Sequence, residues 1–169
     1  SYLEKNDYVF PPDFILKILS FLREQQNSDK INNVLKLVRL FTAFDSIMQQ
    51  FLIDNEIFDI LYNYFPNEEV IDTFSNLACA SIEAKIYLLD SNIIDFILGN
   101  INDLNYFDCL ILLSRNILFN NDEDFTYDQY VPQFTQLFHI LFSKLNFIDD
   151  YSASLIIDAT RYYVEANDN

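Results

Sequence analysis

Four polar residues that could bind a partner recur at intervals of three and four along one stretch of the sequence. They are Glu69, Asp72, Thr73 and Asn76. On an α-helix this spacing places side chains on one face. The two carboxylates could pair with Lys or Arg, and the asparagine could hydrogen-bond the backbone of an extended peptide. The stripe therefore predicts a surface for a basic segment, with an ordinary solvated helix face as the alternative.

Other groups that could do chemistry are few. The acidic run 120–124 (Asn-Asn-Asp-Glu-Asp) offers oxygens for a divalent cation, but it lacks the central glycine and alternating spacing of a calcium loop. A charged loop that caps the next helix is the favoured interpretation. His139 is the only histidine, and no cysteine or second histidine is positioned to complete a metal or acid–base site. No serine lies in the strained turn of an activated nucleophile. We therefore expect no enzyme activity, no catalytic residue, no metal and no cofactor.

The charge of the chain limits its partners. The 169 residues include 26 acidic and 10 basic ones, a formal net charge of -16. Duplex nucleic acid and anionic membranes attract clustered Lys and Arg, so neither is an expected partner. A protein partner with a basic segment is favoured through encounter rate and selectivity. The alternative is that the acids keep an aromatic-rich domain soluble.

The cysteines and the apolar runs bear on the compartment. Cys79 and Cys109 lie inside apolar helical patterns and form no C-x-x-C spacing, which predicts two buried thiols in a reducing compartment. The apolar runs are too short to span a bilayer, and the first residues do not resemble a signal peptide. We expect an intracellular, cytoplasmic protein, with the nucleus left open.

The elements that must position these residues are predicted to be helices. Apolar residues recur at three and four from Phe14 to Leu22, and again from Ile31 to Phe41. Pro11 and Pro12 stand just ahead of the first pattern, where the fixed φ of proline suits a helix start. With a single glycine in the chain, most β architectures are disfavoured, because their turns require glycine. The chain is predicted to be all-α.

The sequence also repeats internally. Residues 34–61 align without gaps on residues 70–97, a shift of 36 residues. At the end of this alignment Asp59 matches Asp95, and the same position falls on Pro12 upstream and Pro132 downstream. Proline and aspartate both suit the first turn of a helix, so these four positions are predicted to be helix starts. A period in this range indicates a stacked-helix solenoid.

Segments 74–80 (Phe-Ser-Asn-Leu-Ala-Cys-Ala) and 84–97 resemble an armadillo repeat. The resemblance implies a right-handed α-solenoid of about three to four repeats forming a single domain over 1–169. The repeats would be a partial one at 11–45, complete ones at 46–80 and 81–119, and a divergent one at 122–168. In the last, the first helix is predicted over 122–129 and the second over 132–144. The glycine turn of the family is replaced by Asn55-Glu56 and Ser91-Asn92, so the left-handed conformation must be carried by asparagine or avoided.

The resemblance also implies where a ligand would lie. In an armadillo stack the stripe on 69–76 lines a concave groove, and neighbouring repeats add further residues to it. These are Asn33, Lys36 and Leu40 on one side and Leu112 and Asn116 on the other. Importin-α adaptors bind basic peptides there through a tryptophan followed four residues later by an asparagine. Asn76 and Asn116 match the asparagine, whereas the tryptophan positions hold Asp72 and Leu112.

Three functions follow as hypotheses. The favoured one is a non-enzymatic protein-interaction module that binds a basic peptide or helix in an acidic concave groove. The second is a structural or scaffold subunit that docks through an end or convex surface into a larger assembly, and an exposed end would also permit self-association. The third, implied by the resemblance alone, is a divergent importin-α-like nuclear import adaptor. The tyrosines near the carboxyl end, Tyr127, Tyr130, Tyr162 and Tyr163, are expected in the core, with an exposed patch as the alternative.

Overall fold

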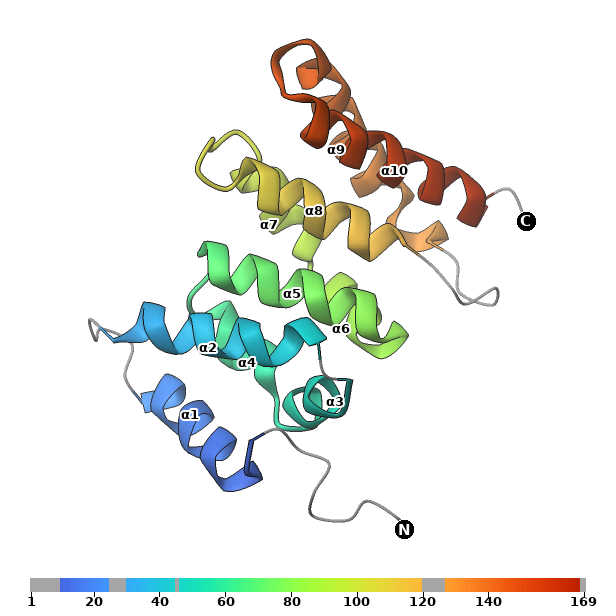
Figure 1. Cartoon of the computed structure of the whole chain (residues 1–169). Helices are drawn as coiled ribbons and strands as arrows, with labels where there is room; N and C mark the ends of the chain where they lie inside the picture. The colour runs from blue at the N-terminus through green and yellow to red at the C-terminus, as the bar shows by residue number, and fades with distance from the viewer. Residues whose placement is uncertain (1–9, 25–29, 45, 120–126, 168–169) are drawn as a thin grey trace. The chain divides into compact units, whose positions relative to one another are not determined.

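The structure is a computed structural model that describes residues 10–24, 30–44, 46–119 and 127–167 (Figure 1). Within these ranges the chain forms ten α-helices and two short 3-10 helices, and no described residue belongs to a β-strand. The all-α class predicted from helical periodicity is therefore confirmed.

The helices follow one another with short connections. In chain order they are α1 Pro12–Glu24, α2 Ile31–Phe44, α3 Ser46–Asp54, α4 Ile57–Tyr62, α5 Glu68–Ala80, α6 Ile82–Asp90, α7 Ile93–Asn100, α8 Phe107–Leu118, α9 Val131–Lys144 and α10 Asp150–Asn167. The 3-10 helix η1, Asp128–Tyr130, precedes α9, and η2, Leu145–Phe147, follows it.

The four aligned positions of the repeat all lie at helix starts. Pro12 begins α1, and Pro132 lies in the first turn of α9. Asp59 and Asp95 are the acidic residues in the first turns of α4 and α7. Proline has no N–H to leave unsatisfied there, and aspartate complements the positive end of the helix dipole. The prediction of four helix starts is confirmed.

The helix bounds carry the same offset as the sequence. α3 and α6 each contain 9 residues, and they begin 36 residues apart at Ser46 and Ile82. α4 and α7 begin at Ile57 and Ile93, again 36 apart. The segments α3–α5 and α6–α8 therefore share one order of two short helices followed by a longer one.

The turn that joins the two short helices is left-handed in both segments. Glu56 has φ 62° and Asn92 has φ 59°, and these residues precede α4 and α7. The expectation that asparagine would carry this conformation is right for Asn92 and wrong for Glu56. Arg23 provides a physical reason, because its Nη2 donates to the carbonyl of Asn55 (3.1 Å) and to the carboxylate of Glu56 (3.3 Å). These bonds hold a backbone conformation that costs a non-glycine residue roughly 1–2 kcal/mol.

The chain divides into two compact units, Ser1–Asn76 and Leu77–Asn169, with the boundary inside α5. In the first unit, Phe74 of α5 is fully buried among aromatic rings. The ring centroids of Phe58, Tyr62 and Phe65 lie 5.7, 5.1 and 6.2 Å from that of Phe74. Tyr64 adds a polar anchor, because its hydroxyl donates to the carbonyl of Leu22 in α1. Burial of this aromatic cluster fixes the inner face of α5, and thereby which of its residues remain accessible.

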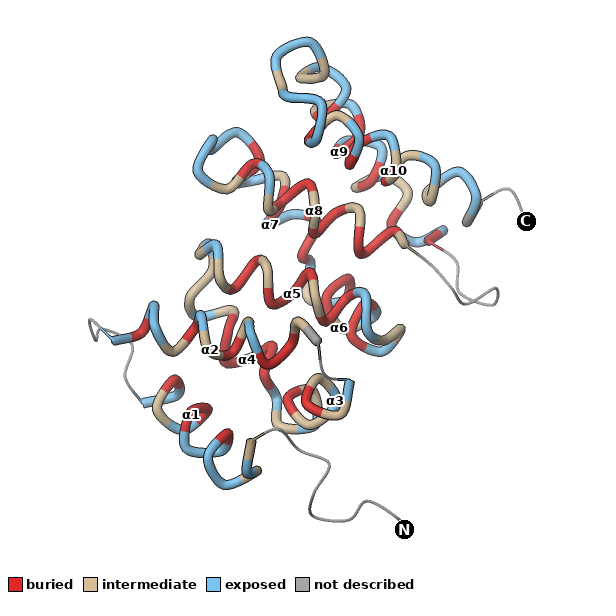
Figure 2. The backbone as a smooth tube through the Cα atoms, viewed as in Figure 1, coloured by how far each residue is buried: buried red, intermediate tan, exposed pale blue. Residues whose placement is uncertain are grey.

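In the second unit α8 packs along α10, and α7 contacts α9. Buried residues line most of α8 (Figure 2). Tyr127 is fully buried; its hydroxyl donates to the carbonyl of Ile117 (2.7 Å), and burial raises its pKa above the ordinary value. Tyr130 donates to Asp90 of α6 at 2.6 Å. The core interpretation is therefore confirmed for Tyr127 and Tyr130, whereas Tyr162 and Tyr163 are half-buried.

Cys79 is exposed and Cys109 is half-buried, so the prediction of two buried thiols is wrong. Cys79 lies near the end of α5, where the helix is exposed. Its apolar neighbours in the sequence did not indicate this exposure. The acidic run 120–124 lies outside the described residues, and so does most of the helix predicted over 122–129. The described residues 127–129 of that helix contribute only to η1, whereas α9 matches the helix predicted over 132–144. Among the described helices, none is both long enough and apolar enough to cross a membrane.

Candidate functional site

The predicted polar stripe lies on α5, which runs beside α2 in the first unit (Figure 1). Three side-chain hydrogen bonds join α2 to α5 and the residue just before it. Asn67, just before α5, donates to Asn32 at 3.2 Å, and Arg39 Nε donates to Glu69 Oε2 at 2.5 Å. Asn76 Nδ2 donates to Thr42 Oγ1 at 3.2 Å. We call this set the α2–α5 polar row, made of Asn32, Lys36, Arg39, Thr42, Asn67, Glu69, Asp72 and Asn76.

The carboxylate of Glu69 already pairs with cationic side chains of this chain. Its second carboxylate oxygen lies 4.0 Å from Lys36 Nζ, in addition to the bond from Arg39. The side chain of Glu69 is only 15% exposed. Charge-assisted hydrogen bonds of this kind are stronger than neutral ones, and Arg39 supplies one. Glu69 therefore fastens α5 to α2 rather than offering a free charge to a partner.

Asp72 is different, because no hydrogen bond or ion pair to its carboxylate occurs among the described residues. The side chain is half-buried on α5, one turn beyond Glu69. Burial raises the pKa of the Asp72 carboxyl above its ordinary value, Arg39 opposes this shift, and Glu68 and Glu69 add to it. A cation brought from outside would stabilise the charged form of this carboxylate.

Thr73 and Asn76 complete the stripe predicted on α5, but both are engaged within the chain. Thr73 is 1% exposed and its hydroxyl donates to the carbonyl of Glu69 at 2.7 Å. Asn76 is half-buried and donates to Thr42, which in turn donates to the carbonyl of Arg39 at 2.8 Å. Asn76 keeps its side-chain carbonyl and a second N–H for other partners. Thr73, by contrast, is a packing residue.

The residues predicted on α2 are accessible. Asn33 and Lys36 are exposed, and Leu40 is 53% exposed. The structure therefore brings together Asn33, Lys36, Leu40, Glu69, Asp72, Thr73 and Asn76 on the adjacent helices α2 and α5 of one unit.

Leu112 and Asn116 belong to α8 of the second unit. Leu112 is half-buried and Asn116 is 7% exposed. The side-chain oxygen of Asn116 accepts a hydrogen bond from Arg115 Nη1 at 2.8 Å. Each asparagine of the predicted motif thus makes a bond inside its own unit, Asn76 as donor and Asn116 as acceptor.

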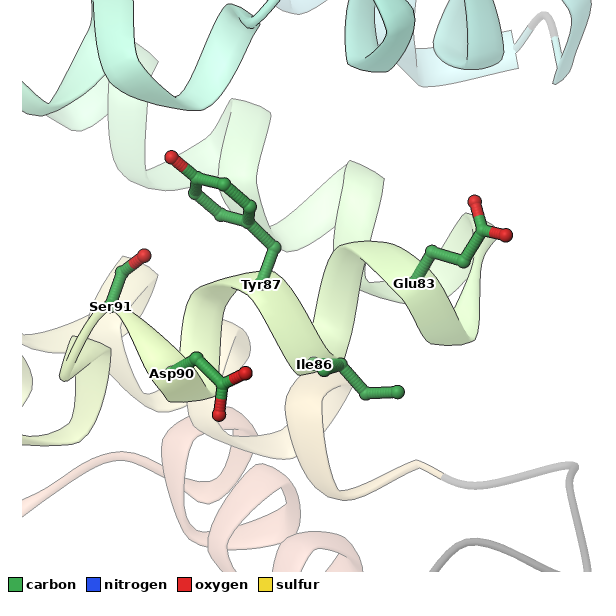
Figure 3. A pocket seen from close by; sticks show the side chains of 5 residues that line it. All are labelled: Glu83, Ile86, Tyr87, Asp90 and Ser91. Carbon is green, nitrogen blue, oxygen red and sulfur yellow. The ribbon is translucent and has the colours of Figure 1, made fainter.

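A hollow on α6 is a feature that the sequence analysis missed. It has a volume of about 400 Å³ and is lined by Glu83, Ile86, Tyr87, Asp90 and Ser91 (Figure 3). All five residues lie on α6 or in the turn after it. Their spacing of three and four was a readable signal for one helix face. The hollow is open, whereas pockets that bind small molecules bury most of the ligand.

The residues that most often bind metals do not cluster in the described part of the chain. Among the described residues, no three or more His, Cys, Asp or Glu side chains are grouped so that they could hold a metal ion. His139 is exposed on α9, and Cys109 donates weakly to the carbonyl of Tyr106 at 3.0 Å.

No family model matches the chain, and comparison with curated proteins and with solved structures likewise gives no match.

Proposed function

We propose that the chain is a non-enzymatic protein-interaction module built as a right-handed, armadillo-like α-solenoid. The offset of 36 residues between the starts of α3 and α6, and again between α4 and α7, supports the repeat. The left-handed residues Glu56 and Asn92 at the equivalent turns support it further. Units of this kind bury their apolar faces against neighbours and leave extended surfaces for partners.

The partner proposed for the α2–α5 polar row is a basic peptide or helix. The observation that carries this is Asp72, a half-buried carboxylate with a raised pKa and no ion pair among the described residues. A lysine or arginine of the partner would supply the missing countercharge, and the free carbonyl of Asn76 would accept a hydrogen bond from the partner. Leu40, exposed on α2, would contact the aliphatic stem of such a side chain.

A lysine-rich peptide with a fluorescent label tests this function by anisotropy. Asp72→Asn keeps the shape of the side chain and is expected to weaken binding about five- to tenfold, the value of one charge-assisted contact. Glu24→Gln is the matched control, because Glu24 is an exposed acid of the same unit and the change removes the same charge. Equal affinity of Asp72→Asn and Glu24→Gln for the peptide would contradict the proposal.

A second candidate function rests on the α6 hollow. Glu83 and Asp90 flank the exposed Ile86, which is 38% accessible, so α6 presents an apolar centre with an acidic rim. This arrangement favours docking of a scaffold subunit against α6. Ile86→Ser would then disrupt co-purification of a native partner while leaving the lysine-rich peptide bound. Retention of the native partner by Ile86→Ser would argue against this surface.

A further inference from the structure

A buried lysine, a half-buried arginine and two aromatic rings form a cluster in the second unit, and the exposed Arg161 also lies 4.8 Å from the centroid of one of these rings, that of Tyr162. The ring centroids of Phe119 and Tyr162 lie 5.1 Å apart with an interplanar angle of 69°. Arg115 Cζ lies 5.5 Å from the centroid of Phe119 and 5.2 Å from that of Tyr162. Lys85 Nζ lies 5.6 Å from the centroid of Phe119. We call Lys85, Arg115, Phe119 and Tyr162 the cation–aromatic cluster; it joins α6, the end of α8, and α10.

Among the described residues, Arg115 donates hydrogen bonds only to neutral groups. It donates to Asn116 Oδ1 at 2.8 Å and to the hydroxyl of Tyr162 at 3.1 Å, while its Nε is buried without a partner. A guanidinium group has five N–H donors, and an aromatic face compensates its charge without accepting them all. The donor capacity of Arg115 is therefore incompletely used.

The other arginines show how unusual this is in an acidic chain. Arg23, Arg39 and Arg161 each pair with a carboxylate, at 3.3, 2.5 and 3.5 Å respectively. Of the four arginines, only Arg115 has no carboxylate within ion-pair distance among the described residues. The 26 acids of the chain thus supply no described partner to this cation.

Lys85, like Arg115, has no carboxylate within ion-pair distance among the described residues, and it is more deeply buried than Arg115. The residue is 5% exposed, and no hydrogen bond or ion pair to its ammonium group occurs among the described residues. Burying a charge without a counterion is costly. Burial lowers the pKa of Lys85 to about 8, and a nearby Cys79 opposes that shift. The exposed Cys79 is also influenced electrostatically by Arg115, so both cations act on an accessible position of the surface.

We propose that Lys85 and Arg115 bind an oxyanion, a carboxylate or phosphate group, carried by a segment of a partner protein. Two cations beside one ring supply the charge, and the planar fork of Arg115 suits bidentate contact with an oxyanion. The net charge of -16 repels anions at long range, so the oxyanion is best delivered on a segment held by other contacts. This site goes beyond the function proposed above, since it has the opposite charge preference and lies wholly in the second unit.

NMR titration of the full chain with inorganic phosphate, and separately with acetate, tests the site at constant ionic strength. The probes are the side-chain Nε–H of Arg115 and the backbone amide of Phe119. Saturable shifts are expected with a Kd of about 1–10 mM for phosphate and weaker binding for acetate, which carries less charge.

Lys85→Met removes one cation, keeps the length of the side chain, and is expected to weaken phosphate binding about tenfold or more. Lys144→Met is the matched control, because Lys144 Nζ also lies over a phenylalanine of the second unit, 5.4 Å from the centroid of Phe107. Shifts that do not saturate, or an equal loss of binding in the two variants, would overturn the proposal.

Short peptides then distinguish the sources of the oxyanion. One peptide carries a single phosphoserine, a second has glutamate at that position, and a third has alanine. Tighter binding of the phosphoserine peptide identifies a phosphate site, and tighter binding of the glutamate peptide identifies a carboxylate site. Binding of the alanine peptide with the same affinity as the other two would refute an oxyanion site altogether.

Discussion

Replacing Lys85 by methionine should stabilise the protein at neutral pH. Lys85 is almost completely buried; its ammonium group lies over the ring of Phe119, and Cys79 influences it electrostatically. Methionine fills a similar volume, carries no charge, and keeps a favourable sulfur contact with the ring. The cost of burying an ammonium group would therefore disappear with little loss of packing.

The magnitude follows from the pKa of Lys85, which burial lowers from 10.5 to about 8. A shift of this size corresponds to about 3 kcal/mol if it is fully expressed. Relaxation of the surrounding structure offsets part of the penalty, so about 1–2 kcal/mol is the expected gain in the free energy of unfolding of Lys85→Met. Because the folded pKa is below the unfolded one, the unfolded state binds more protons between about pH 8 and 10.5. The stability of the parent protein should thus rise relative to Lys85→Met as the pH increases through this window.

Urea unfolding followed by far-ultraviolet circular dichroism measures the difference in the free energy of unfolding between the parent protein and Lys85→Met at about pH 7 and about pH 9.5. The buffers should be free of phosphate, so that an occupied oxyanion site does not stabilise Lys85. Lys17→Met is the control; Lys17 is exposed on α1, and its loss changes the net charge equally. A Lys85→Met variant that is less stable than the parent at neutral pH would refute the reasoning. So would a difference that stays constant to about pH 9.5.

Three other substitutions have defined expectations. Tyr127→Phe leaves the buried carbonyl of Ile117 without its hydrogen-bond donor, so thermal unfolding should show that the free energy of unfolding falls by about 1–2 kcal/mol. Tyr151→Phe, at an exposed tyrosine, is the control, and an equal or larger loss of stability in that variant would contradict the prediction. Glu69→Gln removes the carboxylate charge that pairs with Arg39 and Lys36, and urea unfolding should show that the free energy of unfolding falls by about 1 kcal/mol. Glu68→Gln, at an exposed glutamate, should change it little. Equal effects of the two substitutions would mean that the ion pairs of Glu69 do not stabilise the fold. Arg23→Met removes the two hydrogen bonds to the turn at Asn55 and Glu56, so hydrogen exchange of the backbone amides in α4 should accelerate about two- to fivefold. Lys17→Met is the control and should leave this exchange unchanged. Unaltered exchange in Arg23→Met would show that the turn keeps its conformation without Arg23.

The helices and their starts were predictable because they depend on local sequence. Pro12, Asp59, Asp95 and Pro132 each mark a first turn through backbone geometry and charge, and these effects need no knowledge of distant residues. The left-handed turn at Glu56 was not predicted, because its stabilising contact comes from Arg23, which is 33 residues away in the sequence.

In the candidate sites, too, contacts between residues distant in the sequence could not be predicted from local spacing. Helical spacing identified the α5 face, but the pairing of Glu69 with Arg39 depends on how α2 lies against α5. Likewise Arg115 and Phe119 are four residues apart and could be read as neighbours on one helix, whereas Lys85 and Tyr162 reach them only through packing of α6 and α10. Spacing predicts which residues share a face, and tertiary packing decides which of their charges are already matched.

The two left-handed turns also bear on the response of the chain to heat. A glycine at position 56 or 92 would relieve the strained φ, but it would sample many more conformations in the denatured ensemble. The chain has one glycine, Gly99, which lies inside α7. Glu56 and Asn92 therefore accept native strain while giving up less conformational entropy on folding. Because the entropic contribution to the free energy scales with absolute temperature, this exchange becomes more favourable as the protein is warmed.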